Sequence, residues 1–330
     1  MKSINLAIVG ATGLVGSTFL KVLEEHNEIP INQLYLYASG KSAGKTIMFR
    51  GESHKVIKLA KENVVGKKID YALFSAGGEV SKEYAPLFAK IGTVVIDNSS
   101  AWRMDNSVPL VVPEVNMDEA YKNQGIIANP NCSTIQCMLP LKALHDKFNL
   151  KRVSYSTYQA VSGSGVKGIT DLKNTTLGEG ASFYKYPIYN NCLPHIDAFM
   201  ENKFTKEEMK MVNETRKILQ IEDLSVSATC VRVPVYNCHS IDVLAEFEKE
   251  IDIDEVYNAL KSFENIVVLD DVEQNKYPIA TMCDGQDKVF VGRVRKDIGY
   301  NNAVRFWCVA DNIRKGAASN AVQILIKLIS

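Results

Sequence analysis

Short apolar runs alternate with helix-compatible stretches up to about Asn131. Ile4 to Val9 is apolar apart from Asn5 and is followed by Gly10, which is typical of a buried parallel strand. Apolar residues then recur at helical spacing, at Val15, Phe19, Val22 and Leu23. Further apolar runs cover residues 34–37, 71–75, 94–97 and 125–128, and a helix-compatible stretch covers 82–91. Strands that alternate with helices predict a Rossmann-type, doubly wound α/β domain.

The pattern changes beyond residue 150, where longer strands are predicted. They cover residues 153–161, 227–235, 240–247, 288–295 and 303–309. The strand 240–247 alternates most regularly, because its apolar residues share one face: Ile241, Val243, Ala245 and Phe247. Such alternation indicates a mainly antiparallel sheet with one covered face, on which helices predicted over 206–219 and 253–263 would pack. The second domain is therefore predicted to be α+β.

The C-terminal residues predict one more helix. Its apolar positions repeat at helical spacing: Ala317, Ala321, Ile324 and Leu328. We expect this helix to return to the first domain. The predicted organisation is thus a first domain over 1–131 with the returning segment 312–330, and a second domain over 132–311.

Composition and charge exclude several classes of protein. The 46% hydrophobic and 23% charged residues are near the globular average. Lys plus Arg and Asp plus Glu each number 38, so a formally neutral chain has no broad attraction to nucleic acid or an anionic membrane. No apolar run reaches the ~18 residues of a membrane span. Seven cysteines without a CxxC pair argue against a disulfide framework and against a metal site such as structural zinc. Residues 6–16 mimic a short signal peptide but lack an evident cleavage site, so we expect a cytoplasmic protein.

The glycines between the first strand and the first helix are spaced for a phosphate-binding turn. The segment 10–16 reads GATGLVG, and glycines at such a turn let the backbone approach a pyrophosphate at the helix N-terminus. The spacing is GxxGxxG instead of GxGxxG, so an ordinary glycine-rich turn is the alternative. Residues 39–45, after the second strand, contain two lysines and no acid, which favours NADP over NAD. A solvated loop with incidental lysines is the alternative there.

Cys132 is the candidate nucleophile. It lies in the polar segment 129–134, between an apolar run and a predicted helix, and a helix N-terminus favours thiolate over thiol. Pro140 predicts a kink in that helix or a shorter helix. The alternative for any cysteine is a small buried hydrophobic residue. We interpret the other six in that way: Cys137, Cys192, Cys230, Cys238, Cys283 and Cys308.

A thiolate beside a nicotinamide cofactor points to aldehyde chemistry through a thioester. Such a site needs an acid/base that works near neutral pH, and the chain has five histidines. His239 is the candidate, because it lies in a turn between two predicted strands with Arg232 nearby. An arginine at a strand end suits a carboxylate group of the substrate.

Eight segments, in order along the whole chain, resemble the aspartate-β-semialdehyde dehydrogenase family. They are GATGLVG from Gly10, SSAWR at 99–103, PEVN at 113–116, NPNCST at 129–134, QAVSGSG from Gln159, TKEEMK from Thr205, RVPV from Arg232 with His239, and DNIRKGAASNAVQI from Asp311. The resemblance implies a cytoplasmic homodimer that converts L-4-aspartyl phosphate to L-aspartate 4-semialdehyde and phosphate with NADPH, for lysine, methionine and threonine synthesis. It implies that the first domain binds NADP and that the second carries catalysis and dimerisation.

The resemblance also implies a role for each matching residue. Cys132 would carry the acyl group, and His239 would be the acid/base. The substrate would be held by Gln159 at the acyl group, Arg232 at the α-carboxylate, Glu207 at the α-ammonium, and Arg103 and Lys210 at the phosphate. NADP would be bound by Gly10, Thr12, Gly13, Leu14, Val15, Lys41, Ser42, Ser162, Gly163 and Asn312. Glu207 and Lys210 are three residues apart on a predicted helix. Without the resemblance, we would interpret them as an ion pair on the helix surface.

Two departures from the family pattern and two rival functions remain at this point. Lys41 stands where Arg is common, which would relax selectivity for NADP. Cys238 precedes His239 where a small residue is usual, which suggests an accessory thiol near the site. One rival is an N-acetyl-γ-glutamyl-phosphate reductase, whose acylated substrate would not need an acid such as Glu207. The other is a non-catalytic NADP-binding redox sensor that uses Cys132 as its switch.

Overall fold

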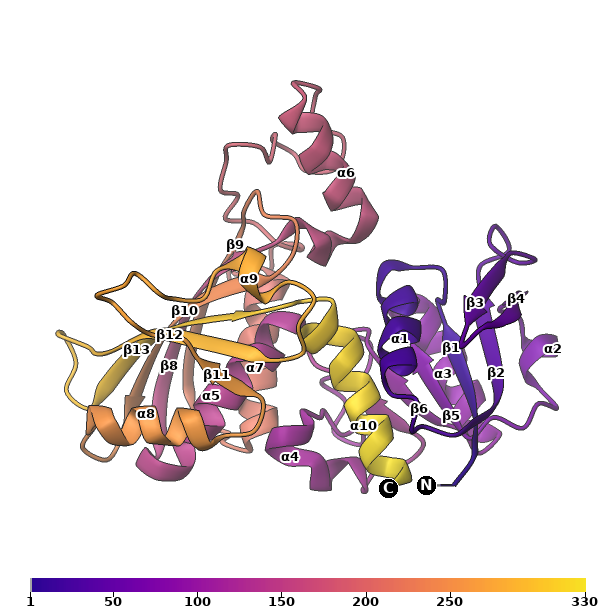
Figure 1. Ribbon diagram of the computed structural model, residues 1–330, viewed down its shortest axis with the longest axis horizontal. Helices are drawn as coiled ribbons and strands as arrows, with labels where there is room; N and C mark the ends of the chain where they lie inside the picture. Colours follow the sequence, from indigo (N-terminus) through magenta and orange to yellow (C-terminus); the bar gives the residue numbers. More distant parts are fainter. Residues whose placement is uncertain (1) are drawn as a thin grey trace. The chain divides into compact units, whose positions relative to one another are not determined.

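A computed structural model of the chain describes residues 2–330 and divides it into two compact units. The first unit comprises the chain up to Pro130 together with Ala317–Ser330, and the second comprises Asn131–Gly316. Figure 1 shows both units. No helix among residues 2–330 has the length and apolarity that crossing a bilayer demands.

The first unit is built on a seven-stranded sheet. Its strands are β1 (Ile4–Val9), β2 (Ile31–Ala38), β3 (Thr46–Phe49), β4 (Glu52–Lys58), β5 (Tyr71–Phe74), β6 (Val94–Asp97) and β7 (Ile126–Ala128). The order across the sheet is β3-β4-β2-β1-β5-β6-β7, and all pairs are parallel except β3 with β4. Parallel strands must be covered on both faces. The sequence prediction of a doubly wound sheet is confirmed.

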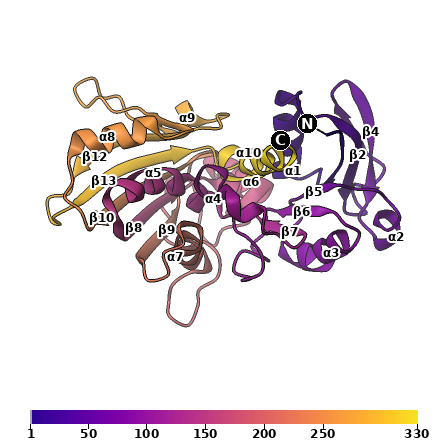
Figure 2. The same cartoon turned by 90° about the horizontal axis from the view of Figure 1, so that it is seen from below.

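Helices cover both faces of this sheet. They are α1 (Leu14–Glu25), α2 (Lys61–Val64), α3 (Gly78–Lys90), α4 (Pro113–Ala120) and α10 (Ser319–Ile329). Helices α1 and α10 share one apolar core with β1, in which Phe19 and Ile324 are fully buried. On the other face Phe88 of α3 packs edge-on against Phe74 of β5, with ring centroids 5.1 Å apart. Figure 2 shows α1 and α10 on one side of the strands and α3 on the other. The C-terminal helix therefore does pack on the first unit.

The second unit is built on a six-stranded sheet. Its strands are β8 (Leu150–Gln159), β9 (Ser225–Arg232), β10 (His239–Phe247), β11 (Ile266–Val268), β12 (Val289–Lys296) and β13 (Ala303–Ala310). The order is β11-β12-β13-β10-β8-β9, with three antiparallel pairs in the middle and a parallel pair at each edge. Alternate residues of β10 are buried from His239 to Phe247, as its pattern predicts.

Helices cover the inner face of this second sheet. Helix α5 (Cys132–Phe148) lies against β10, β8 and β13, and it contacts α7 (Lys206–Leu219) and α8 (Ile253–Ser262). The turn η1 (Val161–Ser164) and helix α6 (Gly165–Thr176) follow β8, α9 (Ala280–Cys283) precedes β12, and the π-helical turn η2 (Arg314–Ala318) leads into α10. An α/β unit joined to an α+β unit with a mainly antiparallel sheet is the predicted fold class.

Two local features differ from the sequence predictions. Of the kink or shorter helix predicted at Pro140, the shorter helix is wrong, because α5 runs through Pro140 as far as Phe148. Proline leaves the carbonyl of the residue four positions earlier without its helical donor, and here the Cys308 thiol donates to that Gln136 carbonyl at 3.4 Å. Cys192 is exposed, whereas the sequence analysis interpreted it as a buried residue. It lies in an irregular segment where no strand or helix turns it inward.

Candidate active site

Cys132 is the first residue of α5, and its neighbour Asn131 caps that helix. The Asn131 side-chain oxygen accepts hydrogen bonds from the backbone N–H groups of Ser133 (3.0 Å) and Thr134 (3.3 Å). Asparagine is among the favoured residues at this position because its side chain satisfies donors that the helix leaves free. The helix therefore starts at a fixed residue, and the Cys132 sulfur lies at its positive end.

His239 is the first residue of β10 and lies beside Cys132. Its Nε2 is 3.2 Å from the Cys132 sulfur, and its Nδ1 accepts a hydrogen bond from the backbone N–H of Ala160 at 3.0 Å. The ring is fully buried. Burial and the adjacent Arg232 guanidinium lower the pKa of His239 to about 3, so the ring is neutral near pH 7.

Arg232 ends β9 and faces the same place. One of its terminal nitrogens donates to the Ala160 carbonyl at 2.6 Å, while its buried Nε has no hydrogen-bond partner among the described residues. Gly163 packs against both side chains, because a Cβ at this position would lie 3.0 Å from Arg232 and 3.3 Å from the His239 ring. A larger residue at Gly163 would therefore displace the Arg232 or His239 side chain.

Glu207 is the centre of a buried hydrogen-bond network. One of its oxygens accepts from Asn131 at 2.9 Å and from Gln159 at 3.0 Å, and the other accepts from Lys210 at 3.2 Å. Burial acts to raise the pKa of Glu207, but the Lys210 charge and these hydrogen bonds lower it to about 2. Lys210 also bonds Asp197 at 2.8 Å. The Glu207–Lys210 pair exists, but Glu207 is only 5% exposed, so it is no ordinary surface pair.

Arg103 belongs to the first unit, where it is buried. It donates to the Asn129 carbonyl and to the Asn98 carbonyl, both at 3.0 Å. Those bonds tie the loop after β6 to the residues that follow β7. The Arg103 guanidinium is therefore bonded to the backbone of Asn129, which precedes Cys132 by three residues.

The turn after β1 leaves backbone donors free. Gly13 caps α1 without a side-chain hydrogen bond, and the turn is closed by its N–H to the Gly10 carbonyl at 2.9 Å. Gly10 has φ of +86°, and a Cβ there would collide with the Ser75 carbonyl. Thr12 and Gly13 are exposed, Leu14 and Val15 begin α1, and the Thr12 hydroxyl donates to Ser42 at 3.2 Å. Lys41, beside Ser42, is exposed.

Ser162 and Asn312 are bonded to each other in the second unit. The Asn312 amide donates to the Ser162 hydroxyl at 3.0 Å, and its oxygen accepts the backbone N–H of Cys238 at 2.9 Å. These contacts fix the turn that precedes His239, in which Cys238 has a φ of 70°.

The Cys238 thiol is not an accessible partner of the site. It is buried against Cys283, Phe290 and Val309, and burial raises its pKa. Its sulfur and the carboxylates of Asp284 and Asp311 lie within 4.8 Å of one another. Asp311 already accepts the backbone N–H groups of Gly285, Ile313 and Arg314, which gives it a structural role.

Several residues at the site carry no motif signal that singles them out. Glu214 of α7 accepts the Asn131 backbone N–H at 2.7 Å, across 83 residues of chain. Gln136 of α5 donates to the carbonyls of His239 (3.1 Å) and Cys308 (3.2 Å). A Cβ at Gly316 would lie 2.8 Å from the Cys132 Cβ. In the sequence the first two resemble ordinary helical positions, and only the burial of their polar side chains reveals them.

A nucleotide-binding α/β unit joined to a sheet unit that holds a cysteine–histidine pair defines a dehydrogenase of the semialdehyde dehydrogenase class. The family models described as semialdehyde dehydrogenase, NAD binding domain, and semialdehyde dehydrogenase, dimerisation domain, match residues 5–123 and 141–315. Aspartate-semialdehyde dehydrogenases of Aquifex aeolicus and Campylobacter jejuni are 56% and 47% identical to the chain. These alignments cover 98% and 99% of the chain and 97% of each relative.

Solved structures agree with the sequence comparison. Aspartate semialdehyde dehydrogenase II from Vibrio cholerae superposes with a TM-score of 0.95 at 44% identity, covering 99% of both chains. The protein therefore belongs to the aspartate-semialdehyde dehydrogenase family of oxidoreductases.

Proposed function

We propose that the protein is a cytoplasmic, NADP- and phosphate-dependent aspartate-semialdehyde dehydrogenase that works through a thioester on Cys132. In the biosynthetic direction it reduces L-4-aspartyl phosphate to L-aspartate 4-semialdehyde and supplies lysine, methionine and threonine synthesis. The observation that carries the proposal is the 3.2 Å contact between the Cys132 sulfur and His239 in a chain of this family. All seven cysteines are unpaired, which supports a reducing compartment.

The first step uses the position of Cys132 at the start of α5. A thiolate is favoured there by the helix dipole and by the neighbouring His239. Its sulfur attacks the acyl carbon, a C–S bond forms, and the bond from that carbon to the phosphate oxygen breaks with its electron pair going to phosphate. We propose that Arg103 and Lys210 hold the departing phosphate, because both are cations and both match the family's phosphate-binding positions.

Substrate recognition follows from unused hydrogen-bonding capacity. Within residues 2–330 the buried Arg232 Nε has no hydrogen-bond partner, and an orphaned buried donor is costly unless a ligand satisfies it. We propose that it binds the α-carboxylate. Glu207 accepts hydrogen bonds from Asn131, Gln159 and Lys210, and a carboxylate has about four acceptor positions, so one remains for the α-ammonium. Gln159, fixed by Glu207, would orient the acyl group. A relative from Vibrio cholerae, 44% identical, has been solved in complex with ASA.

The turn after β1 fits a dinucleotide. Helix α1 has no side-chain cap, and Gly16 allows the helix to approach the turn so closely that a Cβ there would collide with the Gly10 carbonyl. When bound, NADPH supplies the hydride that reduces the thioester. We propose that Thr12 to Val15 hold the pyrophosphate, that Lys41 and Ser42 meet the 2′-phosphate, and that Ser162, Gly163 and Asn312 contact the nicotinamide end. An aspartate semialdehyde dehydrogenase from Candida albicans, 26% identical with a TM-score of 0.78, has been solved with NADP.

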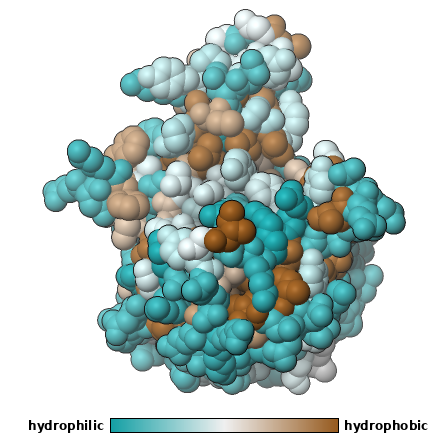
Figure 3. Space-filling model, turned by 90° about the vertical axis from the view of Figure 1, so that its left-hand side faces the viewer, coloured by the Kyte–Doolittle hydropathy of each residue, from teal (hydrophilic) through white to brown (hydrophobic). Residues whose placement is uncertain are grey.

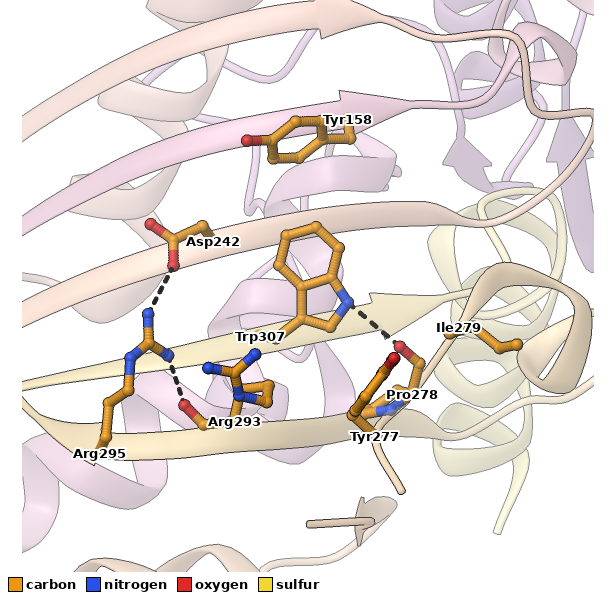
Figure 4. A pocket seen from close by; sticks show the side chains of 8 residues that line it. All are labelled: Tyr158, Asp242, Tyr277, Pro278, Ile279, Arg293, Arg295 and Trp307. Atoms are coloured by element: carbon orange, nitrogen blue, oxygen red, sulfur yellow. Dashed lines mark hydrogen bonds and ion pairs between the residues drawn. The ribbon is translucent and has the colours of Figure 1, made fainter. Parts of the chain in front are cut away.

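We propose that two copies associate through the second unit, on the face of its sheet opposite α5. A hollow of about 450 Å3 lies on this face. Figure 4 shows the aromatic, charged and apolar side chains that line it: Tyr158, Asp242, Tyr277, Pro278, Ile279, Arg293, Arg295 and Trp307. Tyr158 packs against Trp307 with ring centroids 5.3 Å apart and is still 40% exposed. Figure 3 shows apolar patches within the otherwise hydrophilic surface on the side of the second unit. Exposed aromatic groups ringed by charges are typical of subunit contacts.

The dimer is tested by the mass in solution. We expect sedimentation to give a dimer for the wild type and a monomer for Tyr158→Glu. The control is Tyr121→Glu, which changes a tyrosine of the first unit that is even more exposed than Tyr158 and should leave the dimer intact. A monomeric wild type, or a dimer that survives Tyr158→Glu unchanged, contradicts this interface.

One spectrophotometric assay tests the proposed activity. Reduction of NADP by L-aspartate 4-semialdehyde is measured with and without phosphate, and is repeated with NAD and with N-acetylglutamate semialdehyde. We expect rapid, phosphate-dependent reduction of NADP with the aspartate aldehyde alone. Rates independent of phosphate, or a preference for the acetylated aldehyde or for NAD, would overturn the corresponding part of the proposal.

A further inference from the structure

Lys210 is bonded to a second carboxylate, that of Asp197. The Lys210 ammonium donates to Asp197 at 2.8 Å and to the buried Glu207 at 3.2 Å. An ammonium has three N–H donors. Within the described part of the chain these two carboxylates take two of them, so one donor remains for a ligand. The family resemblance implies roles for Glu207 and Lys210 but none for Asp197.

The turn that carries Asp197 is fixed on both sides. Its backbone φ is 67°, in the left-handed region that aspartate and asparagine adopt more readily than most residues with a side chain. The rings of His195 and Phe199, which flank it in the chain, stack with their centroids 4.2 Å apart. The Ala198 carbonyl accepts the first backbone N–H of α7 at 2.9 Å. The Asp197 carboxylate is therefore held beside Lys210 by the backbone as well as by the ion pair.

Both members of the pair are charged near neutral pH. Burial acts to raise the pKa of Asp197, but hydrogen bonds from Lys210 and from the Ala198 backbone N–H lower it overall. Burial acts to lower the pKa of Lys210, but the Glu207 charge and the bond to Asp197 raise it overall. Asp197, Glu207 and Lys210 together thus carry one excess negative charge. The side chains of Lys210 and Asp197 are 24% and 38% exposed, so an anion from solution can reach the pair.

A phosphate at Lys210 would therefore meet one available donor and two negative charges. In the proposed function the substrate α-ammonium neutralises Glu207. The Asp197 charge then remains, and it opposes a phosphate dianion bound to the same ammonium.

We propose that Asp197 competes with phosphate for Lys210 and thereby keeps phosphate binding weak. Asp197 is thus a positioning residue that acts through Lys210, without contacting the reacting atoms. The inference rests on the proposed function and extends it to the release of phosphate. In the biosynthetic direction phosphate is a product, so weaker binding favours its departure.

Asp197→Asn removes the charge and keeps the shape of the side chain. Asparagine tolerates the left-handed backbone and still offers an oxygen to Lys210 and to the Ala198 N–H. We expect the KM for phosphate, measured during oxidation of L-aspartate 4-semialdehyde, to fall by about three- to tenfold. The KM for the aldehyde should change by less than about twofold, because Arg232 and Glu207 are untouched. A KM for phosphate that is unchanged or higher overturns the proposal.

Glu201→Gln is the matched control. It removes one negative charge from an exposed residue of the same loop, whereas Lys210 is bonded to Asp197 and Glu207 instead. We expect this variant to keep the wild-type KM for phosphate. A fall as large as that in Asp197→Asn would reflect the net charge of the region and would overturn competition at Lys210.

Lys210→Gln tests whether the effect passes through the ammonium. This variant alone should raise the KM for phosphate by about tenfold or more. Adding Asp197→Asn to it should change that KM by less than about twofold. An unchanged KM in Lys210→Gln would overturn the proposed phosphate site and this inference with it. A raised KM there, without any effect of Asp197→Asn on the otherwise wild-type enzyme, would overturn the inference alone.

Inhibition by phosphate in the opposite direction gives a second readout. NADPH oxidation with L-4-aspartyl phosphate is measured at increasing phosphate concentrations for the wild type and Asp197→Asn. We expect the inhibition constant of phosphate to fall by the same factor of about three to ten. Damage to the fold would weaken phosphate binding, not strengthen it. An inhibition constant that stays the same or rises contradicts the proposal.

Discussion

The two units provide binding groups in opposite ways. At the turn after β1, Thr12 and Gly13 are exposed and α1 lacks a side-chain cap, so backbone N–H groups remain available for an anion. Around Cys132, by contrast, Asn131, Gln159 and Glu207 are buried and already bonded to one another. A phosphate can be bound by backbone dipoles alone, whereas chemistry at sulfur needs side chains whose orientation and protonation are fixed beforehand. Changes in the second unit should therefore cost far more activity than changes in the first.

The largest effect is expected from removing the nucleophile. Cys132→Ala deletes the sulfur but none of the hydrogen bonds that Asn131 makes to cap α5. We expect kcat to fall by at least ~10⁴-fold, because the thioester can no longer form. NADP binding, followed by fluorescence titration, should stay unchanged because its donors lie in the turn after β1. Turnover that survives in this variant would contradict the thioester mechanism.

The next largest effect tests how tightly the nucleophile is packed. Gly316→Ala places a methyl group 2.8 Å from the Cys132 Cβ, so one of the two must move. Since a displacement of about 1 Å can cost about 10²-fold in rate, we expect a loss of that order in kcat measured at saturating substrate. Gly180→Ala is the control, because a Cβ at that position meets nothing within 4 Å. Equal activity of the two variants would show that the packing around Cys132 is looser than described.

The pH dependence of stability reports on buried His239. Its pKa is about 3 in the folded protein and 6.5 in the unfolded reference. Below pH 6.5 the unfolded chain therefore binds a proton that the folded protein does not, and stability is lost as the pH falls from 6.5 toward 3. Between pH 7 and pH 5 the loss from this group is about 2 kcal/mol.

Urea unfolding at both pH values measures this loss, and His239→Gln is the comparison. The wild type should lose about 2 kcal/mol more than the variant between pH 7 and pH 5. The same loss in both proteins would mean that His239 titrates normally in the folded state.

The smallest effect is expected in the first unit. Lys41 is exposed, so the 2′-phosphate of NADP would meet a solvated cation. The neighbouring Ser42 accepts a hydrogen bond from the Thr12 hydroxyl. Exposed charge pairs contribute little, and we expect Lys41→Ala to raise KM for NADP about fivefold and to leave KM for NAD unchanged. Lys45→Ala, in the same loop, is the control. A loss of 10²-fold would show that selectivity depends on this one side chain and would weaken the contrast between the units.

The periodic parts of the fold could be predicted from the sequence, and the weakly patterned parts could not. Buried β1 and alternating β10 have clear patterns, and both lie where they were expected. The β3–β4 hairpin and helix α6 were missed. Residues 46–58 mix polar and apolar positions without a sustained period, and α6 contains Gly165 and Gly168 together with a run of polar residues. Their structure depends on neighbours, not on local preference.

The motifs predicted which residue types belong to the site but not how they are connected. Nothing local in the sequence indicates that Glu207 binds both Asn131 and Gln159, since these contacts span 76 and 48 residues of chain. The motif at Cys132 likewise does not indicate a role for Glu214 or Gln136. In the sequence both resemble ordinary helical positions, and only the structure shows that their side chains are buried and hydrogen-bonded at the site. His239 also accepts a backbone N–H, that of Ala160, which only the folded chain brings near.

Trapping the acyl-enzyme tests the central claim most directly. Wild-type protein is mixed with L-4-aspartyl phosphate in the absence of NADPH, quenched in acid, digested and analysed by mass spectrometry, with Cys132→Ala treated in parallel. The account predicts an aspartyl adduct on the peptide that contains Cys132, its disappearance when NADPH is added before the quench, and no adduct in the variant. An unmodified Cys132, or an adduct on another residue that is consumed by NADPH, would contradict it.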